Sequence, residues 1–382
     1  MHRTTTFRTA IALAVAGALA PLAALAQATP AATPAAPTFG DVRVLGVATL
    51  PNDLMVGETL VGGLSGIDYD AATDRYYVIS DDRSDNAPAR FYTASVPVSE
   101  QGIGAVTIDG ATSFPQADGT PYPNASAGGN VPDPESIRLD PSTGALFYTS
   151  EGSEKLQIDP FVASTTTDGH FIAQPALPPI FAMSPDGLTG PRDNLVFEGL
   201  SFDVDGQSLW LAMEGPLHQD GPTPTFDHGA VTRITNVDRS GAVLGQYAYE
   251  LNPLPGEDLG GYAGSGVTEI LAVDETRFLV VERAFVADAD GVGVNTIKVY
   301  EIDIAGATDV KSQQWLTPGG YTPVSKTLVL DLAEAGVTPI DNVEGLTWGP
   351  TLANGNRTLV LVSDNNFNDT QVTEFIAVEV AS

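Results

Sequence analysis

Residues 197–215 read FEGLSFDVDGQSLWLAMEG. Apolar and polar residues alternate on both sides of the Asp-Val-Asp-Gly tetrad at 203–206, and such a tetrad is typical of a tight turn. Two alternating runs joined by a turn of this kind predict an antiparallel β-hairpin. Glu198 lies at the start of the first run and Glu214 at the end of the second. Both carboxylates are therefore expected at the same end of the hairpin.

Four other segments repeat this pattern. They read LSGIDYDAATDRYYVISDD from Leu64, PESIRLDPSTGALFYTSEG from Pro134, TEILAVDETRFLVVER from Thr268 and VEGLTWGPTLANGNRTLVLVSDN from Val343. The repeats are spaced by 70, 63, 71 and 75 residues when Ser65, Glu135, Glu198, Glu269 and Glu344 are taken as equivalent. Further strand-like runs lie between the hairpins. A hairpin and two more strands per repeat predict the blade of a β-propeller.

The fold expected is therefore all-β, a single propeller with five blades evident. A sixth blade is the alternative if one has degenerated within residues 105–124 or 305–331. Only one strand, TEFIAVEV, follows the fifth hairpin, so we expect the N-terminal run DVRVLGVATL at 41–50 to complete the last blade and close the ring. A pair of β-sandwiches is the competing architecture. It is less favoured because five similar units suit radial closure.

The N-terminal segment is typical of export. Arg3 and Arg8 precede an apolar run that ends in Ala24-Leu25-Ala26, which predicts a cleaved signal peptide over residues 1–26. A Pro/Ala linker is expected over 27–39 and the propeller over 40–382. No later segment has the roughly 20 apolar residues of a spanning helix. We therefore expect a periplasmic or secreted monomer with no membrane span after cleavage.

The composition narrows the classes of partner. The chain has 17 Lys+Arg against 48 Asp+Glu, a formal charge of −31, and no cysteine. Disulfides and thiolate metal sites are excluded. Nucleic acids are poor partners, because phosphate backbones are bound by clustered basic residues. A small-molecule ligand is the better expectation.

Acidic residues recur at the shared end of the five hairpins. If these are the inner hairpins of a propeller, nine carboxylates gather at one mouth of the central channel. They are Asp81, Glu135, Glu151, Glu198, Glu214, Glu269, Glu282, Glu344 and Asp364. Like charges about 4 Å apart repel by ~4 kcal/mol at an effective dielectric of 20. The cluster therefore requires protonation, basic partners or a bridging cation, and its oxygen donors suit Ca²⁺. The alternative is that these acids accept hydrogen bonds from backbone amides and have a structural role only.

At these hairpins the sequence resembles the "esterase-like activity of phytase" family. The residues that carry the resemblance include Leu64-Ser65-Gly66-Ile67, Pro134-Glu135-Ser136-Ile137, Glu198-Gly199-Leu200-Ser201, Glu282-Arg283, Glu344-Gly345-Leu346 and Ser363-Asp364-Asn365. The resemblance implies a propeller-like fold. By analogy with calcium-dependent propeller phytases, it also implies phosphomonoester hydrolysis.

Two classes of function follow. The favoured one is a metal-dependent hydrolase of a small-molecule ester, with a phosphoric monoester preferred over a carboxylic ester. Glu198 and Glu214 are then the catalytic candidates, and Arg83 and Arg283 are candidates for binding an anionic substrate. The alternative for both arginines is pairing with Asp82 and Glu282. The second class is a non-catalytic propeller that binds a ligand or a partner in the cell envelope.

Overall fold

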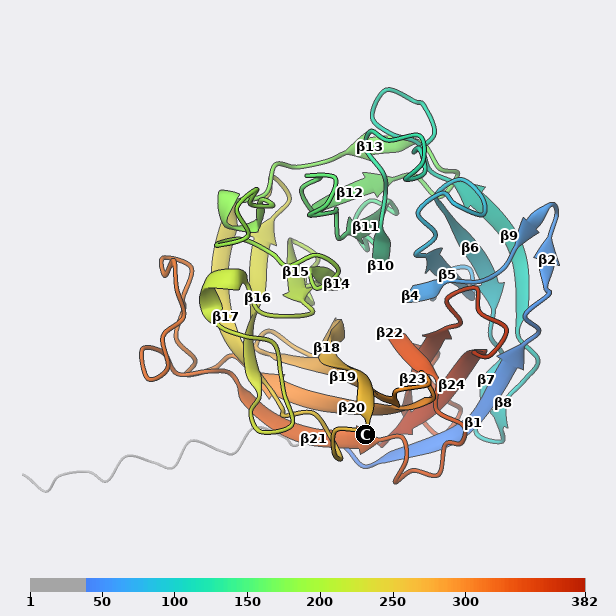
Figure 1. Ribbon diagram of the computed structural model, residues 1–382. Helices are drawn as coiled ribbons and strands as arrows, with labels where there is room; N and C mark the ends of the chain where they lie inside the picture. The colour runs from blue at the N-terminus through green and yellow to red at the C-terminus, as the bar shows by residue number, and fades with distance from the viewer. Residues whose placement is uncertain (1–38, 382) are drawn as a thin grey trace, which may run out of the picture. The chain divides into compact units, whose positions relative to one another are not determined.

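A computed structural model describes residues 39–381. The expected signal peptide, 1–26, and all but the last residue of the expected linker, 27–39, lie outside this range. Among the described residues, five four-stranded antiparallel sheets are arranged around a common centre (Figure 1). The predicted five-bladed propeller is confirmed.

Each blade is a meander of four strands. Blade 1 contains β4 (Leu64–Asp70), β5 (Arg75–Ser80), β6 (Arg90–Ser95) and β9 (Thr107–Ser113). Blade 2 contains β10 (Pro134–Leu139), β11 (Leu146–Ser150), β12 (Phe161–Thr165) and β13 (Phe171–Ala173). Blade 3 contains β14 (Phe197–Phe202), β15 (Ser208–Met213), β16 (Ala230–Asp238) and β17 (Val243–Leu251). In these blades the strands pair in chain order.

Blade 4 has the longest strands. It contains β18 (Gly260–Ala272), β19 (Arg277–Asp288), β20 (Gly293–Asp303) and β21 (Ser325–Asp331). Blade 5 contains β22 (Asn342–Trp348), β23 (Arg357–Asp364), β24 (Thr373–Val380) and β1 (Val42–Leu50). Two short ribbons, β2 (Met55–Val56) with β3 (Thr59–Leu60) and β7 (Val98–Ser99) with β8 (Gly102–Ile103), complete the described strands.

The N-terminal strand closes the ring, as predicted. β1 pairs with β24 from Val42↔Val380 to Leu50↔Thr373, so the last blade is built from both ends of the described chain. Arg43 reinforces this pairing by donating a hydrogen bond to Glu379 from Nε at 3.1 Å. β1 gives blade 5 the same four strands as the other blades, so the ring closes with five complete sheets.

The hydrophobic core lies between neighbouring blades. Leu271 and Leu279 of blade 4 pack with Leu346, Leu361 and their neighbours in blade 5, and similar clusters join the other blades. Within residues 39–381, helix is limited to two 3₁₀ turns, Pro179–Phe181 and His218–Asp220. No helix among the described residues is long and apolar enough to cross a membrane.

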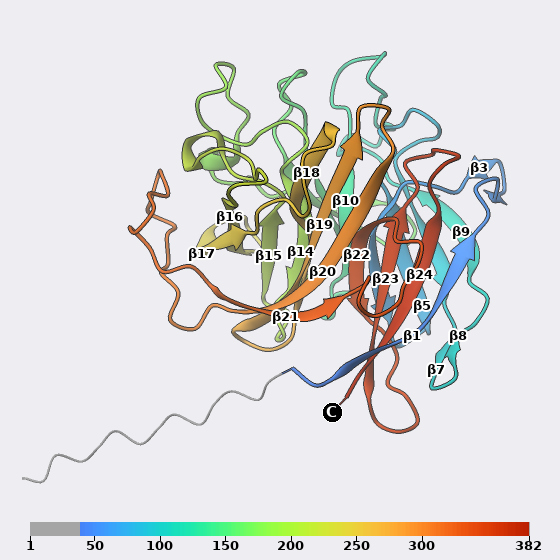
Figure 2. The same ribbon diagram turned by 60° about the horizontal axis from the view of Figure 1, so that its bottom comes forward.

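The first strand of each blade lies nearest the centre. In Figure 1 the strands β4, β10, β14, β18 and β22 surround the axis. Figure 2 shows these hairpins from the side, with long loops gathered at the top of the view. The inner hairpins therefore carry the side chains that face the channel.

Candidate functional site

The inner hairpin of every blade contains a shift in its pairing register at an equivalent place. The extra residue is Ser65 in blade 1, Glu198 in blade 3, Thr268 in blade 4 and Glu344 in blade 5, and in blade 2 the shift spans Glu135 and Ser136. A β-bulge of this kind redirects a side chain away from the normal strand alternation. Three of the five bulges thereby supply a glutamate to the lining of one central cavity.

The second strand of each inner hairpin leads into a charged residue at an equivalent position. These residues are Asp81, Glu151, Glu214, Arg283 and Asp364. Their backbones pair across the hairpin with Gly63, Asp133, Val196, Gly266 and Asn342, respectively. The five blades therefore contribute four carboxylates and one guanidinium at this level.

Blade 4 departs from the sequence-based alignment by one residue. The residue equivalent to Glu198 and Glu344 is Thr268, and Glu269 occupies the next position, where blades 3 and 5 have Gly199 and Gly345. Glu269 does not lie at the mouth with the other predicted carboxylates. It is fully buried deeper in the channel, where it pairs with Arg138.

Glu282 is displaced for the same reason. The residue equivalent to Glu214 is Arg283. Glu282 precedes it, so its side chain points to the other face of β19, because side chains alternate along a strand. Glu282 accepts hydrogen bonds from Tyr249 Oη at 2.6 Å and Asn252 Nδ2 at 2.9 Å, and it pairs with Lys326. It is thus no part of the channel site, and Arg283 pairs with Glu214 and Glu344 instead of with Glu282, the partner that the alternative gave it.

The remaining acids surround one cavity of about 1310 Å³ at the mouth of the channel. Asp81, Glu135, Glu198, Glu214 and Glu344 all line it, as do Arg83 and Arg283. Of the nine carboxylates predicted to gather at a mouth, these five line the cavity, and Glu151 and Asp364 lie directly beside it through their contacts with lining residues.

Two groups of buried carboxylates could each hold a cation. Asp133, Glu135 and Glu151 form one group, and Glu151, Glu198 and Glu214 form the other, with oxygens that all lie within 4.8 Å of one another in each group. Glu151 belongs to both groups and is 1% exposed. One of its carboxylate oxygens, Oε2, is buried without a hydrogen-bond partner. Such an unpaired oxygen costs free energy unless a proton or a cation satisfies it.

The carboxyl groups in these two sets resist ionisation. Burial and the charges of neighbouring carboxylates raise the pKa of Glu135, Glu151 and Glu198 well above the usual range. Burial also raises the pKa of Asp133 to about 7, against the attraction of Arg83. Metal ions bind the deprotonated form, so a cation would have to displace these protons.

Arg283 is the cation that blade 4 places inside the ring. Its Nη2 lies 2.8 Å from Glu214 Oε1, and its Nη1 pairs with Glu344 and lies 2.6 Å from Asn342 Oδ1. Burial opposes its charge, but attraction to Glu344, Glu214 and Glu198 outweighs burial and raises its pKa. Gly266 makes room beside it, since a Cβ there would lie 2.2 Å from Glu214 Cγ.

On the other side of Arg283, Glu344 and Asp364 form a second acidic region with Asp81. Burial, with the nearby charges of Asp81 and Glu214 against Arg283, raises the pKa of Glu344 to about 8. Burial and the charge of Glu344 raise the pKa of Asp364 to about 8. Asn342 donates a hydrogen bond to Glu344 at 2.9 Å, so this region has more polar partners than the Glu151 groups.

Arg83 lies at the rim of the cavity and binds Asp133, a residue that was not among the predicted site residues. Its Nε donates a hydrogen bond to Asp133 Oδ1 at 2.7 Å, and its Nη2 donates one to Asn194 at 2.6 Å. Asp82, the partner that the alternative gave to Arg83, pairs with buried Arg90 at 2.6 Å. Asp133 precedes Glu135 by two residues in Asp-Pro-Glu, which is the one signal that could have drawn attention to it.

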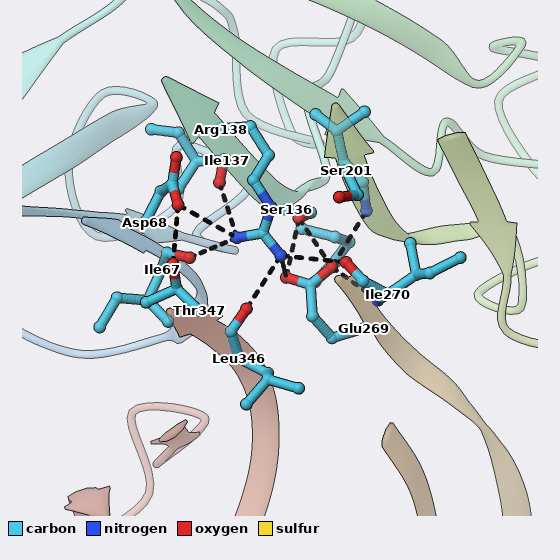
Figure 3. Close-up of polar contacts among 12 residues, drawn as sticks. Ile67, Asp68, Ser136, Ile137, Arg138, Ser201, Glu269, Ile270, Leu346 and Thr347 are labelled. Carbon is cyan, nitrogen blue, oxygen red and sulfur yellow. Dashed lines mark hydrogen bonds and ion pairs between the residues drawn. The ribbon is translucent and has the colours of Figure 1, made fainter. Parts of the chain in front are cut away.

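Arg138 and Glu269 form a buried ion pair among the inner strands (Figure 3). Arg138, 3% exposed, donates hydrogen bonds to the carbonyl oxygens of Ile67, Ile270 at 3.2 Å and Leu346 at 2.9 Å, which belong to blades 1, 4 and 5. It also pairs with Glu269 at 2.8 Å. Glu269 in turn accepts hydrogen bonds from Ser136, Leu200 and Ile270. The guanidinium of Arg138, which lies on β10, thus joins its own inner strand to three others.

Together, the fold and this site define a five-bladed β-propeller with an acidic central cavity. The sequence matches the family described as "Esterase-like activity of phytase", a phytase-like domain, over residues 59–367. The match spans most of the chain, and the protein belongs to this family. The resemblance seen in the hairpin motifs is therefore confirmed.

Other comparisons give only distant likenesses. No match was found among curated proteins. A mannose phosphorylase from Leishmania mexicana has a TM-score of 0.40 at 10% identity, with 88% of each chain covered. The periplasmic gluconolactonase of Pseudomonas aeruginosa has a TM-score of 0.34 at 12% identity, with 85% of this chain and 87% of the other covered. We infer nothing about the site from them.

Proposed function

We propose that this protein is a metal-dependent ester hydrolase that favours phosphoric monoesters, with Ca²⁺ as the metal. The observation that carries the proposal is the pair of buried carboxylate groups that share Glu151, one of whose oxygens has no partner. The other oxygen, Oε1, accepts a hydrogen bond from the backbone amide of Val196, so a structural role accounts for Oε1 and leaves Oε2 unpaired. Carboxylate oxygens are the donors that Ca²⁺ prefers.

The donor set fits a hard cation. Asp133, Glu135 and Glu151 would hold one ion, or Glu151, Glu198 and Glu214 would hold it, and the chain has no cysteine to favour a softer metal. A bound cation of this kind polarises a phosphoryl oxygen and lowers the pKa of bound water. The chain's own residues then have two tasks, which are to position the ester and to handle the proton of the attacking water.

Glu198 and Glu214 are the candidates for handling that proton. Both line the cavity, where a carboxylate that has lost its proton can accept one from the attacking water. Arg283 fixes the Glu214 carboxylate from one side. Arg83, 42% exposed at the rim, is the basic group that an entering anion would meet first.

The experiment measures hydrolysis of 4-nitrophenyl phosphate and 4-nitrophenyl acetate by protein freed of metal, with and without added calcium. We expect calcium-dependent turnover of the phosphate ester. Glu151→Gln should abolish it while the protein remains folded. Glu275→Gln, an exposed residue in the β18–β19 turn, is the matched control and should leave it unchanged. Turnover that persists in Glu151→Gln would refute the role of the two Glu151 groups, and absent turnover with calcium bound would favour the non-catalytic binding class.

We further propose that the mature protein is a monomer exported to the periplasm or the medium. The support is the pattern of residues 1–26 in the sequence. Mass measurement of the protein from cell fractions checks this. A chain that retains residues 1–26 in the cytoplasmic fraction contradicts it.

A further inference from the structure

Blade 4 extends beyond the acidic ring. Its strands β18, β19 and β20 have 13, 12 and 11 residues, and Gly266 and Arg283 mark the level of the ring. Pairing continues past that level through Ser265↔Ala284 and Gly264↔Phe285 to Gly260↔Asp288. The extended ribbon therefore rises over one side of the mouth, and Figure 2 shows the β19–β20 turn among the loops at the top of the view.

This extension presents apolar side chains to the cavity. Tyr262, Phe285 and Val292 all line it, and Tyr262 and Val292 are 68% and 70% exposed. The Tyr262 and Phe285 rings lie 6.4 Å apart between centroids. Tyr262 lies back across its own strand, since a Cβ at Gly264 would be 2.5 Å from the Tyr262 hydroxyl. We call Tyr262, Phe285 and Val292 the blade-4 wall.

Single exposed apolar residues are ordinary on protein surfaces. The blade-4 wall differs because its three members lie on one extended ribbon, two of them with neighbouring rings, and all border the same cavity as the carboxylates. Phe367, from the loop after β23, lines the cavity as well. The cavity thus has charged groups around its inner part and apolar groups on the extension at its mouth.

The charge of the cavity argues against a polyanionic ligand. Among its lining residues only Arg83 and Arg283 are basic, and both are already paired with carboxylates. A ligand with many phosphates would add negative charge to an acidic cavity, whereas a ligand with one phosphoryl group and an apolar body would satisfy both parts. Aromatic rings offer such a body a stacking surface.

We propose that the blade-4 wall binds the apolar, ring-containing alcohol portion of the ester, so that the substrates are aryl or arylalkyl monoesters rather than polyphosphorylated polyols. That this ligand is a substrate rests on the proposed function, but the binding preference can be measured without turnover.

The test compares two phosphonates that cannot be hydrolysed as esters, 1-naphthylmethylphosphonate and methylphosphonate, by calorimetry with calcium present. In the intact protein the naphthyl compound should bind more tightly. Tyr262→Ala should weaken it by about 2- to 12-fold, which is the loss expected from one aromatic pair, and leave methylphosphonate unchanged. Tyr262→Phe should keep the affinity. Trp315→Ala, at a 61% exposed aromatic outside the cavity lining, is the control and should change neither affinity.

Equal affinity of the intact protein for both phosphonates, equal losses for both in Tyr262→Ala, or no binding of the naphthyl compound would each overturn the inference. Turnover of 1-naphthyl phosphate and glycerol 2-phosphate is measured in parallel. Selective binding without turnover would refute the proposed hydrolase and leave the wall's preference standing. Turnover with no preference between the two esters, and none between the two phosphonates, would refute the wall alone.

Discussion

Replacing Arg283 with methionine should destabilise the metal-free protein more than any loss of a surface ion pair. The Glu214 pair alone, at 2.8 Å, corresponds to about 6 kcal/mol of attraction at an effective dielectric of 20. Protonation of the abandoned carboxylates limits the loss, so we expect about 3–5 kcal/mol, the usual cost of breaking a buried pair. At roughly 2.1 cal/mol/K of unfolding entropy per residue, this lowers Tm by about 4–7 °C.

The assay is thermal unfolding at pH 7 in the presence of a chelator. The matched control is Arg75→Met, which removes a 3.2 Å pair with Asp109 whose side chains are 49% and 35% exposed. Exposed pairs contribute about 0–1 kcal/mol, so the control should change Tm by ~1 °C or less. If Arg283→Met lowers Tm no more than Arg75→Met does, Arg283 is not the counter-charge of the ring, and its pairs with Glu214 and Glu344 do not stabilise the fold as argued.

Three further predictions concern the metal, the pH dependence and the ring. Calcium at a hundredfold excess over Kd should stabilise metal-free protein by about 2.7 kcal/mol, which raises Tm by roughly 4 °C relative to sodium chloride of the same ionic strength. Glu151→Gln should reduce this rise in Tm. Identical melting curves with calcium and with EDTA would contradict a metal centre. Because carboxyl pKa values rise from 4.5 to about 8 for Glu344 and from 3.8 to about 8 for Asp364, folded metal-free protein binds more protons than unfolded protein between these values. Its unfolding free energy should therefore fall from pH 5 to 8 in denaturant titrations, and a rise would contradict the raised pKa values. Deleting residues 41–50 should destabilise the entire propeller, because β24 loses its outer partner; a truncated protein that melts like the full chain refutes closure by β1.

The blades could be predicted because hairpin formation depends on local pattern. Alternating apolar residues, turn tetrads and the spare strand at 41–50 are all visible in the sequence, and they gave five blades and the closing strand. Seven of the nine expected carboxylates lie in or directly beside the cavity for the same reason, since both ends of a hairpin are fixed by its turn.

The exception was the register of blade 4. An alignment on the acidic residues matches Glu269 with Glu198, whereas the residue of blade 4 that is structurally equivalent to Glu198 is Thr268. Alignment on the buried apolar residue that follows, Ile270 in blade 4 and Leu200 in blade 3, would have given the correct register. Burial of an apolar side chain constrains register more strongly than the position of a charge, because a slip of one residue turns every side chain to the other face.

The buried contacts of Arg138 could not be predicted at all. Arg138 is bound by carbonyl groups that lie 71, 132 and 208 positions away in the sequence. Backbone carbonyl groups are present at every residue, so no side-chain pattern marks these three. Only the closed ring of inner strands brings them around one guanidinium.

The pairing of β1 with β24 also determines when this protein can fold. Arg43 and Glu379, which interact across the two strands, are 336 positions apart. At about 5–20 residues per second, a ribosome needs roughly 17–67 s to add that length. During that interval β1 has no partner, and blade 5 cannot be completed. A circular permutant that carries residues 41–50 after β24 would turn this pairing into a local hairpin, and low contact order speeds folding. The natural order of strands therefore keeps the propeller open until its last blade has been made.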